Sequence, residues 1–437
     1  MIVNIREQIE RVIIAVVMVA MASWFSACTF DTSGVPSEPD APYVYDQMEA
    51  SPAVDMTDND RWVAYFDFRD RLLAYHGRAC FEAKNSVGKH HIGYRVRDRI
   101  NLIDKFDDEA TVFMNGWDVE YKGRNDHKVL GLGVTIFDIK RVGDELHWQA
   151  WAALSDINGD DAIKICYYYT VVMWEHQSEG IEAFPIHSDN AGSLLFIGSE
   201  EGNVPARRHI PGIIEDSQSA PRAVLPQGFG AMHTDRDDHN LLQLAFNYGD
   251  TITFFNPGVP SGADGPGTIS WIGDSIFQDN QFRKIRTFNM VSGLSGRSVT
   301  VEQPQFDFNP RRPVSCLGNR VVDFEKEVTV EVPFEHAIPM LTGWRLDNAC
   351  DDTHLKRMGV WITDFDFYRN RDTNMGVLTY RVAGTLYDDG KSQGLSSAHY
   401  PRYKVSILGF NSLDSATLLT GEQEQTDPTS GRIRNRR

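Results

Sequence analysis

The chain has 437 residues and a formal net charge of −18, with 41% hydrophobic and 11% aromatic residues. This hydrophobic content is enough to build ordinary cores, and the length predicts about three domains of roughly 150 residues each. The acidic excess disfavours DNA, RNA and anionic lipid as partners, because those ligands need Lys and Arg to neutralise phosphate. We therefore expect no nucleic-acid binding, and the charge fits a soluble, exported surface protein.

Residues 1–27 are typical of an export signal. Arg6 and Arg11 precede an apolar run of about fourteen residues that ends at Phe25. This run is shorter than the roughly twenty residues that a membrane-spanning helix needs. We therefore expect a signal peptide over residues 1–27.

The end of the run, Phe25-Ser26-Ala27-Cys28, resembles the lipobox of bacterial lipoproteins, in which a small residue precedes a cysteine that is lipidated and becomes the new N-terminus. Phe25 stands where leucine is usual, and Glu7 and Glu10 dilute the positive charge of the leading region. An ordinary signal peptide or an uncleaved anchor is the alternative. The resemblance implies attachment to a membrane through a lipid on Cys28. With Thr29 after the cysteine, it also implies the outer membrane of a bacterial cell envelope, facing the periplasm or the surface.

A tether and an N-terminal extension follow the lipid site. Residues 28–58 contain four prolines and several acidic residues, which is the composition of a polar, extended linker. In the extension, residues 59–87, apolar residues have near-helical spacing and Asp58 is a candidate N-cap. We therefore expect one short helix over about residues 59–75, although the alternation of Phe66 and Phe68 also fits a strand.

One sequence pattern occurs three times in the chain: a glycine followed by an aromatic residue, a histidine eleven positions after the glycine, and then a strand-like run. The copies begin at Gly116-Trp117, Gly228-Phe229 and Gly343-Trp344. Their glycines lie 112 and 115 residues apart, which is the size of a small domain and too long for a solenoid unit. We predict three tandem repeats, at residues 88–177, 200–296 and 318–411, followed by a disordered tail over 412–437.

The pattern inside each repeat predicts β-strands. Apolar residues alternate from Ile163 to Met173, and Val328, Val330 and Val332 alternate with polar residues. Runs of this period, rich in β-branched and aromatic residues and bounded by Gly, Asp, Asn and Pro, are typical of strands. Because each repeat offers about five or six such runs, we predict an all-β fold of three small antiparallel β-sandwich domains.

The order of these runs resembles the H-type lectin domain, a small β-sandwich that binds GalNAc-like sugars as a trimer. In repeat 3 the resemblance is carried by Val328-Thr329-Val330, Gly343-Trp344 and the closing run from Tyr403 to Phe410. It implies the fold, with three copies in one chain standing where the family has a trimer. At the place of the family's sugar-contacting Trp-His pair, this chain has Leu154-Ser155, Phe277-Gln278 and Tyr387-Asp388. The family's sugar site therefore does not carry over.

Four cysteines remain after the lipid site: Cys80, Cys166, Cys316 and Cys350. An even number in an exported chain permits two disulfides, and sequence cannot separate the three ways of pairing them. The pairs Cys80–Cys166 and Cys316–Cys350 would each staple one end of the molecule. Free buried thiols are the alternative. The four occupy no common repeat position, so a shared metal site is not expected.

The repeated histidines are the first candidates for ligand binding. They are His127, His239 and His354, and the first two follow Asp126 and Asp238. A histidine beside a carboxylate can bind a metal or a polar ligand. The structural interpretation is favoured, because an Asp-His step that enters a strand can close a turn by hydrogen bonding to the backbone. The aromatic residues after the repeated glycines are likewise expected in the core rather than as sugar platforms.

Asp156, Asn158 and Asp160 bring several oxygen donors close together, which suits Ca²⁺. The segment departs from an EF-hand loop, in which glycine comes sixth and helices lie on both sides. A hairpin turn is the favoured interpretation, because the other repeats have Asp279-Asn280 and Asp388-Asp389-Gly390 at the same position. Ca²⁺-dependent carbohydrate binding remains an alternative function, and no other cofactor is expected.

A second alternative is an exported esterase. Gly273-Asp274-Ser275 resembles the nucleophile block of the GDSL esterases, and Asp351 with His354 supplies their D-x-x-H pair. The order of the blocks differs from that family, because the matching Gly123-Arg124-Asn125-Asp126 precedes both others, and no βαβ alternation is visible. We therefore predict a non-catalytic lipoprotein of the cell envelope that binds a glycan or another envelope protein, or has a structural role.

Overall fold

A computed structural model describes the protein at Ala53 and, between Phe66 and Phe410, along 22 strands and some of their turns. The described ranges are 53, 66–68, 72–84, 93–101, 109–123, 129–156, 161–174, 182–185, 196–197, 206–214, 221–233, 241–254, 267–279, 285–295, 299–302, 316–317, 321–347, 355–388, 394–395 and 402–410. Within these ranges there are strands and turns and no helix, so the predicted all-β fold is confirmed. No helix in this part of the chain is long and apolar enough to cross a membrane.

The helix expected near residues 59–75 is wrong wherever the structure describes that segment. Phe66–Phe68 forms β1, and the next strand begins at Leu72. The two strands pair with each other, Phe66 opposite Ala74 and Phe68 opposite Leu72. Pairing between strands has therefore overridden a near-helical spacing of apolar residues.

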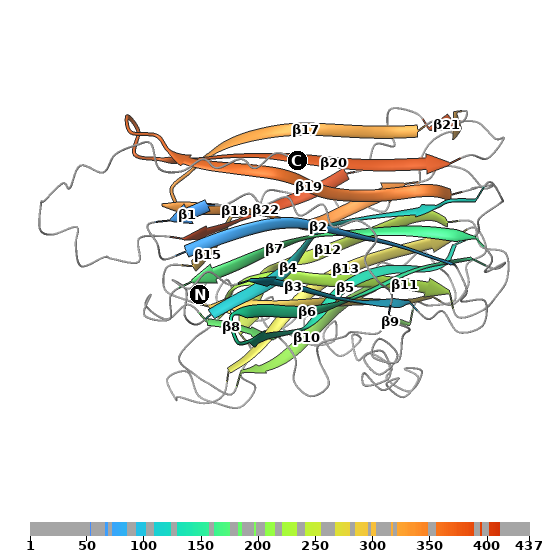
Figure 1. The fold of residues 1–437 in the computed structure, drawn as a ribbon, viewed down its shortest axis with the longest axis horizontal. Coiled ribbons are helices and arrows are strands. Elements are labelled where there is room, and N and C mark those ends of the chain that lie inside the picture. The colour runs from blue at the N-terminus through green and yellow to red at the C-terminus, as the bar shows by residue number, and fades with distance from the viewer. Residues whose placement is uncertain are drawn as a thin grey trace, which may run out of the picture. The chain divides into compact units, whose positions relative to one another are not determined.

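Each repeat has six main strands when the strand that lies just before its predicted range (β2, β8 or β15) is counted with it (Figure 1). Repeat 1 has β2 (Leu72–Lys84), β3 (Tyr94–Asn101), β4 (Glu109–Tyr121), β5 (Val129–Val142), β6 (Glu145–Asp156) and β7 (Ala162–Trp174). Repeat 2 has β8 (Glu182–Pro185), β10 (Ala206–Ile214), β11 (Pro221–His233), β12 (Leu241–Phe254), β13 (Gly267–Asp279) and β14 (Ile285–Ser295). Repeat 3 has β15 (Val299–Glu302), β17 (Val321–Val332), β18 (His336–Asp347), β19 (Leu355–Arg369), β20 (Gly376–Asp388) and β22 (Arg402–Phe410).

Every large sheet contains strands of two repeats. Sheet A has the order β3-β6-β5-β11-β14-β8, sheet B has β1-β2-β7-β4-β19-β20-β17, and sheet C has β10-β13-β12-β18-β22-β15. The short β9 (Phe196–Ile197) pairs with β14, and β16 (Cys316–Leu317) pairs with β21 (Gly394–Leu395). At the middle of the sheets, β5 pairs with β11, β12 with β18, and β19 with β4. The three repeats are thereby joined in a closed cycle, in which repeat 3 returns to repeat 1.

The recurring aromatic residues meet inside this cycle. Trp117, Phe229 and Trp344 are all fully buried. Their ring centroids lie 5.0 Å apart for Trp117 and Phe229, 4.8 Å for Phe229 and Trp344, and 6.0 Å for Trp117 and Trp344. The prediction that these residues belong to the core is confirmed, and they bring the three repeats together at one point.

A β-bulge precedes the recurring glycine in all three repeats. The register of the ladder shifts by one residue just before Gly116, Gly228 and Gly343. A bulge places one extra residue in its strand and re-aims that side chain. The extra residues are polar and buried: Asn115, Gln227 and Thr342.

Each bulge residue makes hydrogen bonds that tie the repeats together. All three contact a hydroxyl on the last strand of their own repeat: Asn115 with Thr170 at 2.9 Å, Gln227 with Ser292 at 2.8 Å and Thr342 with Ser406 at 2.5 Å. Asn115 also donates to the carbonyl oxygen of Pro339 in repeat 3, and Gln227 to that of Val112 in repeat 1. The bulges thus satisfy buried polar groups across the junctions between repeats.

Candidate functional site on the outward face of sheet B

Most of the site residues predicted from sequence lie outside the described residues. They are Cys28, Asp126, His127, Asn158, Asp160, Asp238, His239, Cys350 and His354. Their roles in lipidation, ligand binding, calcium binding or a second disulfide stay predictions. Cys316 lies in β16, which pairs with β21. Within the described ranges, no group of three or more His, Cys, Asp or Glu side chains could hold a metal ion.

Asp156 is the predicted calcium ligand that the structure does describe. It ends β6, lies opposite Val129 of β5 and is only 1% exposed. Burial raises the pKa of the nearby Tyr121 well above its usual value, and the charges of Asp156 and Asp161 raise it further. The Tyr121 phenol therefore stays protonated, and this end of repeat 1 holds two buried carboxylates beside it.

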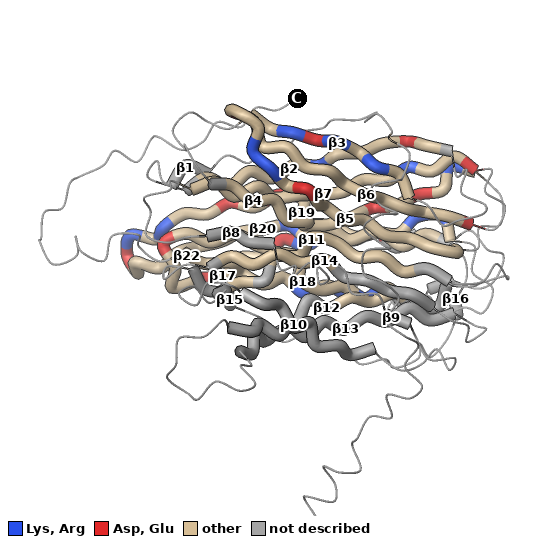
Figure 2. Tube along the Cα trace, turned by 90° about the horizontal axis from the view of Figure 1, so that it is seen from below, with Lys and Arg blue, Asp and Glu red and all other residues tan. Residues whose placement is uncertain are grey.

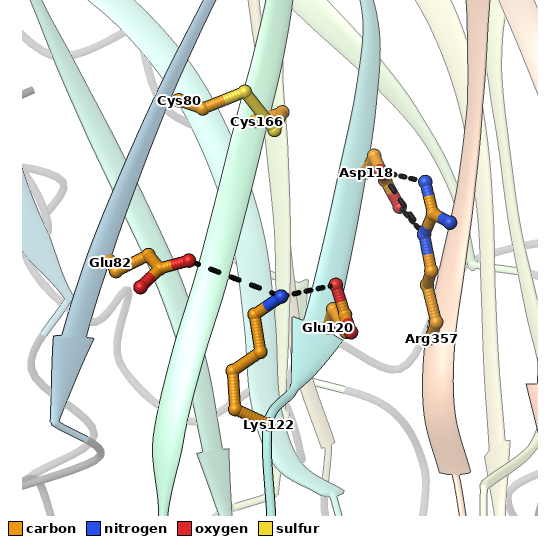
Figure 3. Close-up of polar contacts among 7 residues, drawn as sticks. All are labelled: Cys80, Glu82, Asp118, Glu120, Lys122, Cys166 and Arg357. Carbon is orange, nitrogen blue, oxygen red and sulfur yellow. Dashed lines mark hydrogen bonds and ion pairs between the residues drawn. A yellow bond between two sulfur atoms is a disulfide. The ribbon is translucent and has the colours of Figure 1, made fainter. Parts of the chain in front are cut away.

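Two of the predicted disulfide cysteines are joined. Cys80 in β2 and Cys166 in β7 form a disulfide between directly opposite residues of neighbouring strands, with their Cα atoms 4.1 Å apart (Figure 3). Both residues are buried. The disulfide lies on the outward face of sheet B, which we define as the face opposite the main hydrophobic core.

The same face carries an ion pair across the junction of repeats 1 and 3. The Asp118 carboxylate in β4 accepts bonds from Arg357 in β19, from Nε at 2.9 Å and from Nη2 at 2.6 Å (Figure 3). This two-point geometry fixes the guanidinium plane and is stronger than a single contact. Burial raises the pKa of Asp118, although the Arg357 hydrogen bonds and charge lower it in part. The pKa of Arg357 is raised, first of all by its bond to Asp118.

Further charges on this face are also arranged in pairs. The Lys122 ammonium lies 3.0 Å from Glu120 and 4.0 Å from Glu82, so it bridges two strands (Figure 3). On the other side of the junction, Arg381 of β20 bonds to Asp364 of β19. These partly exposed pairs are worth little for stability one by one, but they hold charged groups in fixed positions on a broad surface.

Between these charges lies a pair of aromatic rings. Trp361 of β19 and Tyr168 of β7 stack with centroids 5.2 Å apart and planes only 8° from parallel. Tyr168 is buried, whereas Trp361 is half-buried and packs against the disulfide cluster. Burial raises the pKa of Tyr168 to about 12, so its hydroxyl stays neutral at physiological pH. The outward face of sheet B therefore combines a supported aromatic ring with fixed charged groups.

Sequence reasoning did not find this face. Asp118 directly follows the recurring Gly-Trp step, which was the available signal, but Arg357 lies 239 positions away. The equivalents of Asp118 in the other repeats are Gly230 and Arg345, and those of Trp361 are Thr135 and Asn247. Because no repeat shares these residues with another, a search for repeated surface residues passes over them.

The esterase block has an unsuitable setting. Ser275 lies inside β13, opposite Ala206 of β10 and Phe246 of β12. It is therefore paired on both sides in the interior of a sheet, whereas the nucleophilic serine of an α/β-hydrolase sits on an exposed strand-to-helix turn.

Comparisons of the chain with protein-family models, with curated proteins and with solved structures find no match.

Proposed function

We propose that the protein is a non-catalytic, lipid-anchored module of the bacterial cell envelope that binds a glycan on the outward face of sheet B. The observation that carries this proposal is the half-buried Trp361, held parallel to Tyr168 and flanked by the Asp118–Arg357 pair. Small-molecule sites commonly combine aromatic surface with a few precisely placed polar groups. A sugar ring could lie on the indole while its hydroxyls bond to the neighbouring charged side chains.

Two further observations support parts of the proposal. The position of Ser275 inside β13 weighs against the esterase alternative, because both neighbouring strands pair with it there. The Phe25-Ser26-Ala27-Cys28 sequence supports a lipid anchor. Labelling cells with an alkyne-tagged fatty acid tests the anchor: the wild-type protein should take up the label, and Cys28→Ser should not.

The glycan-binding part is tested on a glycan array with the full-length protein, with and without Ca²⁺. We expect saturable binding of one class of sugar, which Trp361→Ala abolishes. The matched control is Tyr368→Ala, which removes an aromatic side chain that is 56% exposed on the same strand, β19. Thermal unfolding of both variants checks that they are folded. Sugar binding that Trp361→Ala leaves unchanged would place the site elsewhere.

A structural role in the envelope is the second candidate function. It is favoured by the burial of Trp117, Phe229 and Trp344 against one another, which commits the recurring aromatics to joining the repeats. Absence of binding to every glycan on the array, with and without Ca²⁺, would favour this role over glycan binding.

A further inference from the structure

Strand β17 forms one margin of sheet B (Figure 1). It pairs with β20 without interruption from Val321 opposite Tyr387 to Val332 opposite Gly376. On its other side, no strand among the described residues pairs with it. Edges of this length are usually shortened, bulged, broken by proline, covered or lined with charged side chains, because their open N–H and C=O groups can pair with another chain. Charged side chains are the device that β17 has, and their sign decides which strands they repel. β17 has neither a proline nor a bulge over its 12 residues.

Repeat 1 contains an equivalent edge strand, β3, for comparison. Ile100 of β3 lies opposite Leu146, and Val330 of β17 lies opposite Leu378, the matching leucine of repeat 3. This register equates Arg95, Arg97, Asp98 and Arg99 with Glu325, Glu327, Val328 and Thr329. The two strands therefore occupy the same place in their repeats, with Arg95 and Arg97 of β3 replaced by glutamates in β17.

The edge of β3 is occupied at two points. The backbone N–H of Arg99 donates to the Asp98 side chain at 2.8 Å, so a side chain satisfies that group. Farther along, Ala53 forms a parallel bridge with Arg95. This position in a repeat thus accepts an additional extended segment once in the molecule. At β17 the residue that matches Asp98 is Val328, which has no polar group to cap the edge.

The side chains of β17 indicate what would fit beside it. Its exposed charged residues are mainly acidic: Asp323, Glu325, Glu327 and Glu331, with Lys326 as the one base of the strand. On the opposite side of the strand, Phe324, Val328 and Val330 are half-buried and pack against the core. A strand added to β17 would extend both rows, so it should present basic residues on one face and apolar residues on the other.

We infer that β17 binds an extended, basic segment of a partner protein by strand addition. Pairing of β17 with the β17 of a second copy fits less well, since it would place acid against acid. Figure 2 shows basic residues along β3, which has the charge that a partner strand needs. The inference goes beyond the proposed glycan binding, because it concerns the margin of the sheet and a polypeptide ligand.

The test uses full-length protein and a fluorescent synthetic peptide with the sequence of Tyr94–Asn101 carrying Asp98→Val. This peptide alternates arginines with apolar residues. The control peptide also carries Arg95→Glu, Arg97→Glu and Arg99→Glu. We expect saturable binding of the basic peptide, weakened by salt, and at least tenfold weaker binding of the acidic one. Equal binding of both peptides, or no binding of the basic peptide, would overturn the inference.

Variants of the protein locate the site. Glu327→Lys combined with Glu331→Lys should weaken the basic peptide at least tenfold and strengthen the acidic one. The matched control combines Asp144→Lys with Asp372→Lys, which makes the same change in net charge at exposed turn positions; it should leave binding unchanged. A similar loss in both double variants would mean attraction to overall charge, against a site at β17.

Backbone methylation separates strand addition from simple ionic attraction. One peptide is N-methylated at its arginines and another at the intervening residues, with the charges unchanged. Because only one edge of an added strand faces β17, one of these peptides should bind like the parent and the other should lose binding. Equal affinities of the two methylated peptides would contradict strand addition. Glycan binding is tested separately, with Trp361→Ala on the outward face of sheet B. Either proposal can therefore fail without the other.

Discussion

The Nε2 atom of His76 lies 2.9 Å from the carbonyl oxygen of Ile362, although the two residues are 286 positions apart. The carbonyl can only accept, so Nε2 carries the proton. Nδ1 then accepts from the Thr170 hydroxyl at 3.1 Å, and that hydroxyl accepts from Asn115. Asn115 in turn accepts from the backbone N–H of Leu341 at 2.7 Å. A chain of buried hydrogen bonds therefore runs from repeat 3 through repeat 1 and back to repeat 3.

This arrangement predicts a dependence of stability on pH. Burial lowers the pKa of His76 from 6.5 to about 4. Between these values the unfolded chain binds the proton more readily, so stability is complete above pH 6.5 and is lost as the pH falls toward 4. The loss attributable to His76 is at most about 3 kcal/mol. The free energy of unfolding should be measured with denaturant at several pH values from 4 to 7. It should depend less steeply on pH in His76→Gln, a variant that can keep both hydrogen bonds. Identical slopes would contradict the assignment.

The close approach of repeats at the glycines predicts a large cost for adding one methyl group. Gly228 has a φ of +157°, and a Cβ there would lie 2.3 Å from the Cα of Thr135 on β5. Gly228→Ala should lower the free energy of unfolding by about 2–4 kcal/mol. Gly143 is the matched control: its φ is +60°, but a Cβ there would meet nothing within 4 Å. Gly143→Ala should lower the free energy of unfolding by only about 1–2 kcal/mol. Equal losses in the two variants would show that the close contact between Gly228 and Thr135 does not matter.

The disulfide predicts a further stability difference. Cys80 and Cys166 close a loop with a sequence separation of 86 residues, for which the chain-entropy model gives about 4.6 kcal/mol. The double variant Cys80→Ala with Cys166→Ala should therefore unfold at lower denaturant concentration. The disulfide of the wild-type protein can also be reduced in mild denaturant before the protein is returned to buffer. This reduced protein should then unfold at nearly the same denaturant concentration as the double variant. A double variant as stable as the wild type would show that the crosslink contributes nothing.

We expect the protein to become more stable when Lys404 is replaced by an apolar residue. The lysine is buried in β22, and burial lowers its pKa from 10.5 to about 8. The unfolded chain binds the proton more strongly between these values, so stability should rise as the pH increases from 8 to 10.5. Lys404→Met, which introduces the residue found at the equivalent Met290, should add about 1–2 kcal/mol at pH 7 and remove that rise. Lys326→Met on the exposed edge should change little, and a loss of stability in Lys404→Met would contradict the reasoning.

Sequence predicted the class of fold and the core far better than the way the repeats associate. Alternation of apolar residues shows which residues face inward, and burial of Trp117 and its equivalents follows from that. It does not show which copy a strand pairs with, so the pairing of β4 with β19 could not be foreseen. The sequence also did not reveal the first strand of each repeat, because these strands are not alike in length: β2 has 13 residues, whereas β8 and β15 have 4 each. They lie before the ranges predicted for their repeats.

The candidate site escaped for a similar reason. Asp118 and Trp361 come from different repeats, and the equivalent positions of the other copies hold other residue types. Repetition points to what every copy needs in order to fold, such as the glycine and the buried aromatic residue. It therefore leads away from a surface that one junction alone possesses.

The central claim is that the three repeats share their sheets in a closed cycle. Differential scanning calorimetry of the full-length protein tests this claim most directly. Since no repeat holds a complete large sheet of its own, the repeats should unfold together. The account predicts one transition whose calorimetric enthalpy equals its van't Hoff enthalpy. Two or three separable transitions, each with its own midpoint, would contradict it and indicate repeats that fold independently.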